Sequence, residues 1–182
     1  WDREWYKTFQ EFRIHLVRAI DDLIETFENS TDIPVFHLDG QTIMLEDYLE
    51  IKPGSRERLR KLITEKRLLI GPWYCMPDEF LASGEALIRN LQMGHRNCDE
   101  WGVDPWEIGY ICDIFGHIAQ LPQILAGFGI KGALLGRGTN DRDTPAHFLW
   151  MSPDESSCIT FKVPEECGYG TFWLDVWEPY DS

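Results

Sequence analysis

The sequence lacks any run of apolar residues long enough to cross a membrane, since a membrane-spanning helix needs about 18 of them in succession. It also lacks internal repeats, low-complexity segments and any Cys-x-x-Cys spacing, and its five cysteines are an odd number. We therefore interpret the cysteines as reduced thiols of a cytoplasmic protein, not as a disulfide framework. Positive charge is scarce too: the formal net charge of −14 would repel phosphate groups. Nucleic acid and membranes are thus not expected as partners.

The 182 residues are enough for one domain with a sizeable core. Amphipathic periodicity predicts helices at residues 8–29, 83–101 and 118–126 and from residue 55 onward. Apolar runs between them predict strands at residues 33–38, 67–71 and 130–135, and one that ends at residue 112. This alternation predicts an α/β fold with a mainly parallel sheet. Strand-like runs at 146–151, 158–163 and 170–174 predict strand pairs at a sheet edge, or segments whose partners lie further along a longer chain.

The most informative stretch is residues 106–120, where a short apolar strand ends at a lone carboxylate, Asp113. The carboxyl ends of strands are where α/β sheets place their ligands, so an acid there is a candidate for chemistry. The alternative is that Asp113 only caps the helix that begins near His117, because Asp is a favourable capping residue. The strand pattern by itself leaves both interpretations open.

The first six residues form a second informative segment, in which Trp1, Trp5 and Tyr6 stand close to Asp2. So many rings are unusual in an exposed tail. They indicate either the first turn of an amphipathic helix whose rings fill the core, or the rim of a polar pocket in which aromatic walls hold a sugar ring.

Together these segments resemble glycoside hydrolase family 38, the zinc-dependent retaining α-mannosidases, in its bacterial branch. The resemblance is carried by Trp-Asp-Arg-Glu-Trp-Tyr at residues 1–6 and Asp-Ile-Phe-Gly-His at residues 113–117. Further matches are residues 71–79 and residues 127–133, which lead to Arg137. The resemblance spans almost the whole chain in the expected order. It implies hydrolysis of terminal α-linked mannose from oligosaccharides or mannosyl conjugates, so the expected partner is a carbohydrate substrate.

The resemblance also implies roles for five side chains. Asp113 would be the catalytic nucleophile and, with Asp2, a ligand of Zn²⁺. Trp5 and Phe115 would line the sugar site. Arg137 would hydrogen-bond the nucleophilic carboxylate, which an arginine can do with two parallel bonds.

The fold that the resemblance implies is a seven-stranded, barrel-like sheet of the glycoside hydrolase/deacetylase type, which here lacks its first strand. Residues 1–182 would form part of the amino-terminal catalytic α/β domain of a larger glycosidase. One zinc-binding histidine would directly precede Trp1, while a distal histidine and the acid/base carboxylate would follow Ser182. We therefore expect residues 1–182 alone to be inactive. His117 does not match a zinc ligand and is interpreted as a supporting or helix-start histidine.

Two other classes of function remain open. A metal-dependent carbohydrate deacetylase uses a related fold, but the pair of histidines at helical spacing that it requires does not occur here. The chain could also be a non-catalytic sugar- or metal-binding scaffold. The sequence leaves open a homo-oligomer formed through the longer chain.

Overall fold

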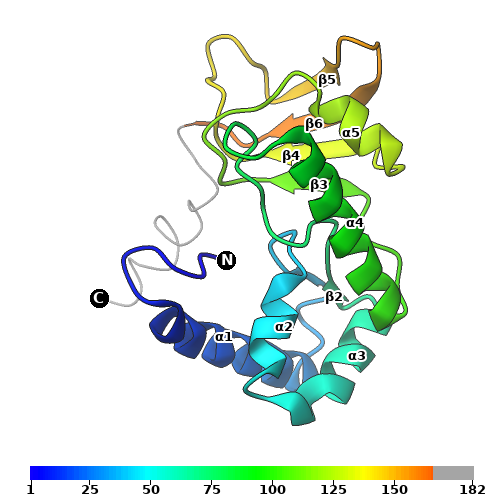
Figure 1. The fold of residues 1–182 in the computed structure, drawn as a ribbon. Helices are drawn as coiled ribbons and strands as arrows, with labels where there is room; N and C mark the ends of the chain where they lie inside the picture. The colour runs from blue at the N-terminus through cyan, green and yellow to red at the C-terminus, as the bar shows by residue number, and fades with distance from the viewer. Residues whose placement is uncertain (166–182) are drawn as a thin grey trace. The chain divides into compact units, whose positions relative to one another are not determined.

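The computed structural model describes residues 1–165, which divide into two compact units (Figure 1). The first unit comprises residues 1–75 and 90–106, and the second comprises residues 76–89 and those from 107 onward. The predicted strand at 170–174 lies outside the described residues. In chain order the elements are α1 (Phe9–Asn29), β1 (Phe36–His37), α2 (Ile43–Leu49), the 3₁₀ turn η1 (Pro53–Ser55), α3 (Arg56–Thr64), β2 (Leu68–Leu69), α4 (Gly84–Trp101), β3 (Ile108–Ile111), α5 (Leu121–Gly127), β4 (Gly132–Leu135), β5 (His147–Met151) and β6 (Ser157–Lys162).

Helix α1 confirms the helix predicted at residues 8–29. It begins with a capping box, in which the Thr8 side chain accepts from the Glu11 amide and the Glu11 carboxylate accepts from the Thr8 amide. Its buried residues recur every three or four positions and give the helix one apolar face: Leu16, Ile20, Ile24 and Phe27. That face joins the hydrophobic core of the first unit, to which α2, α3 and β2 also contribute.

The first unit also contains a two-stranded parallel sheet, in which Phe36 of β1 pairs with Leu68 of β2. Both strands are shorter than the apolar runs that predicted them. Helix α2, which the periodicity did not predict, follows β1 and buries Tyr48 and Leu45 in the core. A single parallel bridge between Gln41 and Trp73 continues the pairing beyond the two strands.

The second unit is built on a four-stranded sheet in the order β3-β4-β6-β5 (Figure 1). The β3–β4 and β4–β6 pairings are parallel, and β5 runs antiparallel to β6. Between β3 and β4 the chain passes through α5, whose Leu125 packs so tightly on Gly109 of β3 that a Cβ there would lie 2.7 Å from it. This β3–α5–β4 crossover brings two parallel strand ends to the same edge of the sheet.

The expected seven-stranded barrel is wrong for the described residues. They contain six strands, divided between a two-stranded and a four-stranded sheet. A barrel requires every strand to pair on both sides, whereas β3 and β5 each pair on one side only among residues 1–165. The described residues therefore form an open four-stranded sheet in the second unit and a separate two-stranded sheet in the first.

The longest helices, α1 and α4, carry charged residues along their length, and none of the described helices could span a membrane.

Gly94 of α4 lies against the loop that follows β2. A Cβ at Gly94 would lie 2.1 Å from the Pro72 carbonyl oxygen, which no side chain tolerates. Gly84, the first residue of the same helix, has open space around it.

We expect Gly94→Ala to destabilise the full-length protein that contains this chain by about 3 kcal/mol, because the added methyl group forces the helix away from the loop. Gly84→Ala is the matched control and should stabilise by up to about 1 kcal/mol, since alanine is the better helix former. Thermal unfolding of the two variants beside the wild type measures the difference. Equal unfolding temperatures for both variants would contradict the predicted contact.

His37 of β1 gives the first unit a pH-dependent stability. Its ring stacks at 3.9 Å from the Trp106 ring, and its Nε2 lies 3.2 Å from the Gly71 carbonyl oxygen. Burial lowers the pKa of His37 to about 4, although the Gly71 carbonyl and the charge of Asp39 oppose the shift. The unfolded chain therefore takes up this proton at a higher pH than the folded chain does.

This linkage predicts that His37 makes a contribution to the free energy of unfolding that is fully present above pH 6.5. The contribution is lost as the pH falls from 6.5 to about 4. The loss attributable to His37 should be at most about 3 kcal/mol. His37→Gln retains a donor for the Gly71 carbonyl but cannot titrate, so denaturant unfolding from pH 4 to 7 should show a flatter profile for this variant. An unchanged slope would show that His37 is not the group responsible.

Candidate active site

The register of β3 and β4 brings Asp113 and Arg137 together. Ile111 pairs with Leu135 at the end of the two parallel strands. Asp113 and Arg137 each follow their strand's last residue by two positions, so both leave the sheet at the same edge. Parallel sheets place their ligands at this edge.

Arg137 forms an ion pair with Asp113. Its Nη2 lies 2.5 Å from Asp113 Oδ1 and also donates to the Asp113 main-chain oxygen at 3.2 Å. The Asp113 and Arg137 side chains are 39% and 43% exposed, so this pair lies at the surface of the second unit. One guanidinium nitrogen makes both contacts, so Arg137 binds both the side chain and the backbone of Asp113.

Phe115 completes this group of side chains. Its ring is 75% exposed, and the Arg137 guanidinium carbon lies 4.2 Å from the ring centroid. An exposed ring beside a carboxylate is suited to pack against the apolar face of a sugar. The structure therefore brings together Asp113, Phe115 and Arg137, and their roles in catalysis and substrate binding stay predictions.

The two glycines beside Arg137 make this close approach possible. A Cβ at Gly136 would lie 2.1 Å from the Cys112 carbonyl oxygen. Gly138 has a φ of +89°, and a Cβ there would lie 2.8 Å from His117 Nε2. Side chains at either position would push the Arg137 segment away from the end of β3.

Glu79 and His117 form a buried pair beside this group, and the role of Glu79 was missed from the sequence. Glu79 Oε1 lies 2.8 Å from His117 Nδ1, and the two side chains are 0% and 5% exposed. Burial lowers the pKa of His117, but the hydrogen bond and charge of Glu79, with the Arg137 carbonyl, outweigh it, and the net pKa is raised. No linear pattern distinguishes Glu79 from the neighbouring Asp78, which accepts from the Phe80 amide in an exposed turn.

The sequence-predicted residues Asp2 and Trp5 lie in the first unit, and both are exposed. Trp5 is 73% exposed and packs edge-to-face against Tyr6 at 5.1 Å. The alternative that these first rings fill the core is thus wrong for Trp5 and Tyr6, whereas Trp1 does pack against the core. Asp2 belongs to a different unit from Asp113, and the convergence of their carboxylates stays a prediction.

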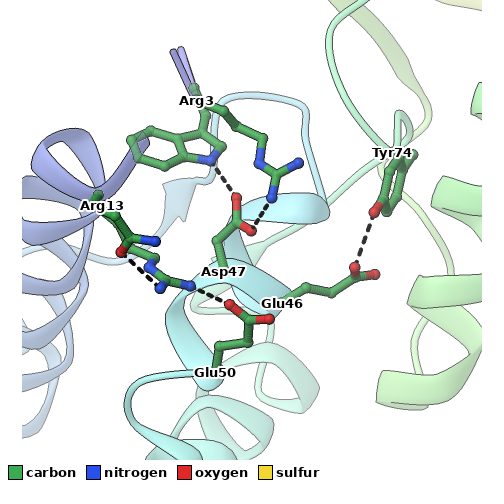
Figure 2. A network of polar contacts seen from close by, with 8 residues as sticks. Arg3, Arg13, Glu46, Asp47, Glu50 and Tyr74 are labelled. Carbon is green, nitrogen blue, oxygen red and sulfur yellow. Dashed lines mark hydrogen bonds and ion pairs between the residues drawn. The ribbon is translucent and has the colours of Figure 1, made fainter. Parts of the chain in front are cut away.

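Buried Asp47 of α2 accepts hydrogen bonds from the side chains of Trp1 and Arg3 (Figure 2). The Trp1 indole donates to Asp47 Oδ2 at 2.7 Å, and Arg3 Nη2 pairs with Asp47 Oδ1 at 2.9 Å. Nearby, the Tyr74 hydroxyl donates to Glu46 Oε2 at 3.0 Å. One carboxylate thus accepts hydrogen bonds from the side chains on both sides of Asp2, whose own side chain is exposed.

The described residues do not by themselves form a zinc site. Among residues 1–165, no three His, Cys, Asp or Glu side chains gather in an arrangement that could hold a metal ion. The two expected ligands, Asp2 and Asp113, are both carboxylates, whereas protein zinc sites have three or four ligands and usually include imidazole or thiolate. Residues 1–165 by themselves therefore supply only part of such a ligand set.

Comparison with known proteins identifies the family. The sequence model of the glycosyl hydrolases family 38 N-terminal domain matches residues 1–171. A Halalkalibacterium halodurans protein with the provisional name mannosylglycerate hydrolase is 43% identical over 171 residues, which are 87% of this chain and 19% of that protein. Mouse alpha-mannosidase 2C1 is 29% identical over 174 residues, which are 93% of this chain and 16% of that protein.

Solved structures agree with this identification. The crystal structure of an alpha-mannosidase from Enterococcus faecalis V583 superposes with a TM-score of 0.85 at 35% identity, and the match covers 89% of this chain and 19% of that one. The chain thus spans about a fifth of the length of such relatives. With the match to the family model over residues 1–171, these likenesses show that the chain belongs to glycoside hydrolase family 38, a family of hydrolase-type enzymes, and corresponds to its N-terminal domain.

Proposed function

We propose that the full-length protein hydrolyses terminal α-linked mannose from oligosaccharides or mannosyl conjugates with retention of configuration. The observation that carries this proposal is the Asp113–Arg137 ion pair at the carboxyl end of two parallel strands in a family 38 chain. The names of the relatives, a mannosylglycerate hydrolase and alpha-mannosidases, support mannose as the sugar.

In the proposed mechanism, Asp113 Oδ attacks the anomeric carbon of the sugar and forms a covalent glycosyl ester. The bond between that carbon and the leaving oxygen breaks, and a carboxylic acid supplied from outside residues 1–165 gives the leaving oxygen its proton. Water then cleaves the ester with the same group acting as base, so the configuration is retained. Arg137 orients the Asp113 carboxylate for attack, and the exposed Phe115 ring packs against the sugar.

We further propose Zn²⁺ as the cofactor, with Asp2 and Asp113 as two of its ligands and imidazoles from outside this chain as the others. When bound, zinc would hold neighbouring hydroxyl groups of the sugar and favour the distortion of its ring. The hydrogen bonds from the Trp1 and Arg3 side chains to Asp47 support this role, since a preorganised ligand favours metal binding.

A cytoplasmic location is proposed as well. The support for this proposal is in the sequence, whose five cysteines are odd in number and show no Cys-x-x-Cys spacing.

Asp113→Asn should reduce the kcat of the full-length protein for an aryl α-mannoside by at least about 10³-fold, because the amide cannot attack the sugar. Arg137→Lys should cost about 10-fold, since lysine keeps the charge but loses the planar guanidinium that contacts both Oδ1 and the main-chain oxygen of Asp113. The control is Asp104→Asn, an exposed carboxylate of the first unit, which should leave kcat unchanged. Steady-state kinetics with folded variants measure all three.

Trapping with a mechanism-based fluorosugar, followed by peptide mapping, tests the proposed nucleophile directly. The label should reside on Asp113, and NMR of the first-formed sugar should show the α anomer. A label on another carboxylate, or the β anomer as first product, would contradict the assignment of Asp113 as the nucleophile of a retaining mechanism. Acetate release from acetylated sugars without mannoside hydrolysis would favour a deacetylase instead.

Removal of metal tests the proposed cofactor. Dialysis of the full-length protein against a chelator should abolish α-mannoside hydrolysis, and one equivalent of Zn²⁺ per chain should restore it. Asp2→Ala should weaken zinc affinity about 10- to 100-fold, measured by competition with a zinc-binding dye. Full activity of protein shown by elemental analysis to be metal-free would overturn the zinc proposal.

A further inference from the structure

The buried pair of Glu79 and His117 has no part in the proposed mechanism, although it lies beside the residues that do. Charged and titratable side chains are rarely buried unless they are paired, because their desolvation costs free energy. Here both side chains are almost completely buried, and their contact is 2.8 Å long. The hydrogen bonds that the two side chains make to neighbouring segments indicate why the pair is buried here.

The pair joins three segments that are distant in the sequence. Glu79 Oε2 accepts from the Ile118 amide at 2.7 Å, which holds the loop before α4 against the segment that follows Asp113. On its other side, His117 Nε2 lies 2.8 Å from the main-chain oxygen of Arg137. One carboxylate and one imidazole thus connect the loop of Glu79, the segment between β3 and α5, and the segment that follows β4.

The imidazole also fits closely against the Arg137 segment. The His117 ring leaves no room for a side chain at Gly138. A Cβ added there would lie 2.8 Å from Nε2 and 3.0 Å from Cδ2 of the ring. A ring nitrogen that carries a proton can donate to the Arg137 carbonyl, and a neighbouring carboxylate strengthens that hydrogen bond. The raised pKa of His117 agrees with a ring that holds its protons between two oxygen acceptors.

The backbone of Arg137 is consequently held by His117, while its guanidinium reaches Asp113. Because the exposed ion pair would by itself contribute only about 0–1 kcal/mol, it cannot hold the Arg137 segment in position. A second contact to the same residue, from the nearly buried His117 ring to the Arg137 carbonyl, adds to it. Glu79 holds that ring in a buried pair, and the loss of one partner of a buried pair is costly.

We propose that Glu79 and His117 are positioning residues: by holding the Arg137 carbonyl through His117 Nε2, they place the guanidinium that orients Asp113. This inference rests on the proposed function for its kinetic consequence, because Asp113 must be the nucleophile for its orientation to affect the rate. It assigns the buried pair a role in the chemical step, not only in folding.

Two substitutions of His117 separate the two contacts of the ring. The Gln amide nitrogen occupies roughly the position of Nε2, so His117→Gln keeps a donor for the Arg137 carbonyl and loses the contact with Glu79. The Asn amide nitrogen occupies roughly the position of Nδ1, so His117→Asn keeps a donor for Glu79 and loses the one for Arg137. The exposed His147 of β5 offers a matched control, His147→Asn.

In the full-length protein with an aryl α-mannoside, we expect His117→Asn to lower kcat by about 10- to 100-fold while KM stays within about twofold. His117→Gln should recover most of that loss, and His147→Asn should match the wild type. The rate of fluorosugar labelling should follow the same order, because it reports the attack by Asp113. Equal kcat values for His117→Asn and His117→Gln would overturn the proposal.

Crystal structures of the two His117 variants give a readout that does not need activity. The contact between Arg137 Nη2 and Asp113 Oδ1 should be lost or displaced in His117→Asn and kept in His117→Gln. An unchanged contact in His117→Asn would overturn the inference. If the wild type hydrolyses no α-mannoside, the proposed function fails, and these structures still decide whether His117 positions Arg137.

Discussion

The parallel pairing of β3 with β4, with Ile111 opposite Leu135, is the constraint on which the candidate active site depends. It fixes the points at which two chain segments leave the sheet, and Asp113 and Arg137 lie equally far beyond those points. The ion pair follows from this geometry and does not create it, because a half-exposed pair contributes too little free energy to bring two segments together. The strand register thus determines where Asp113 and Arg137 lie, at the edge of the sheet.

The second requirement is a fixed direction for each side chain once it has left the sheet. Strand ends alone do not provide it, since the segments beyond them are loops. Glu79 and His117 provide it through hydrogen bonds of two side chains that are almost completely buried, and buried hydrogen-bonded pairs resist separation far more than exposed ones. A rigid sheet edge and a buried polar pair thus support an ion pair that remains open to a ligand.

Most helices and the strand that leads to Asp113 could be predicted from the sequence, because periodic apolar residues report directly on a local element. Helix α2 was not predicted from its seven residues; α5 is equally short, but it lies between two predicted strands and ends at a glycine, which marks its position. The barrel expected from the family resemblance is wrong here, because pairing between strands is not local. The close packing at Gly136 and Gly138 and the burial of Glu79 depend on neighbours that are more than 20 residues away in the sequence, so no linear pattern could identify them.

The exposure of the site limits what the described residues can do by themselves. Hydrogen bonds and charges act most strongly on a reacting sugar where water is excluded, because water screens them. Asp113, Arg137 and Phe115 are all open to solvent in the described part of the chain, and no three metal-binding side chains converge among residues 1–165. These residues therefore form one wall of a site, with a positioned carboxylate and an aromatic surface. A substrate bound there would still need a proton donor and a cover, which in a relative five times as long can come from the remaining chain.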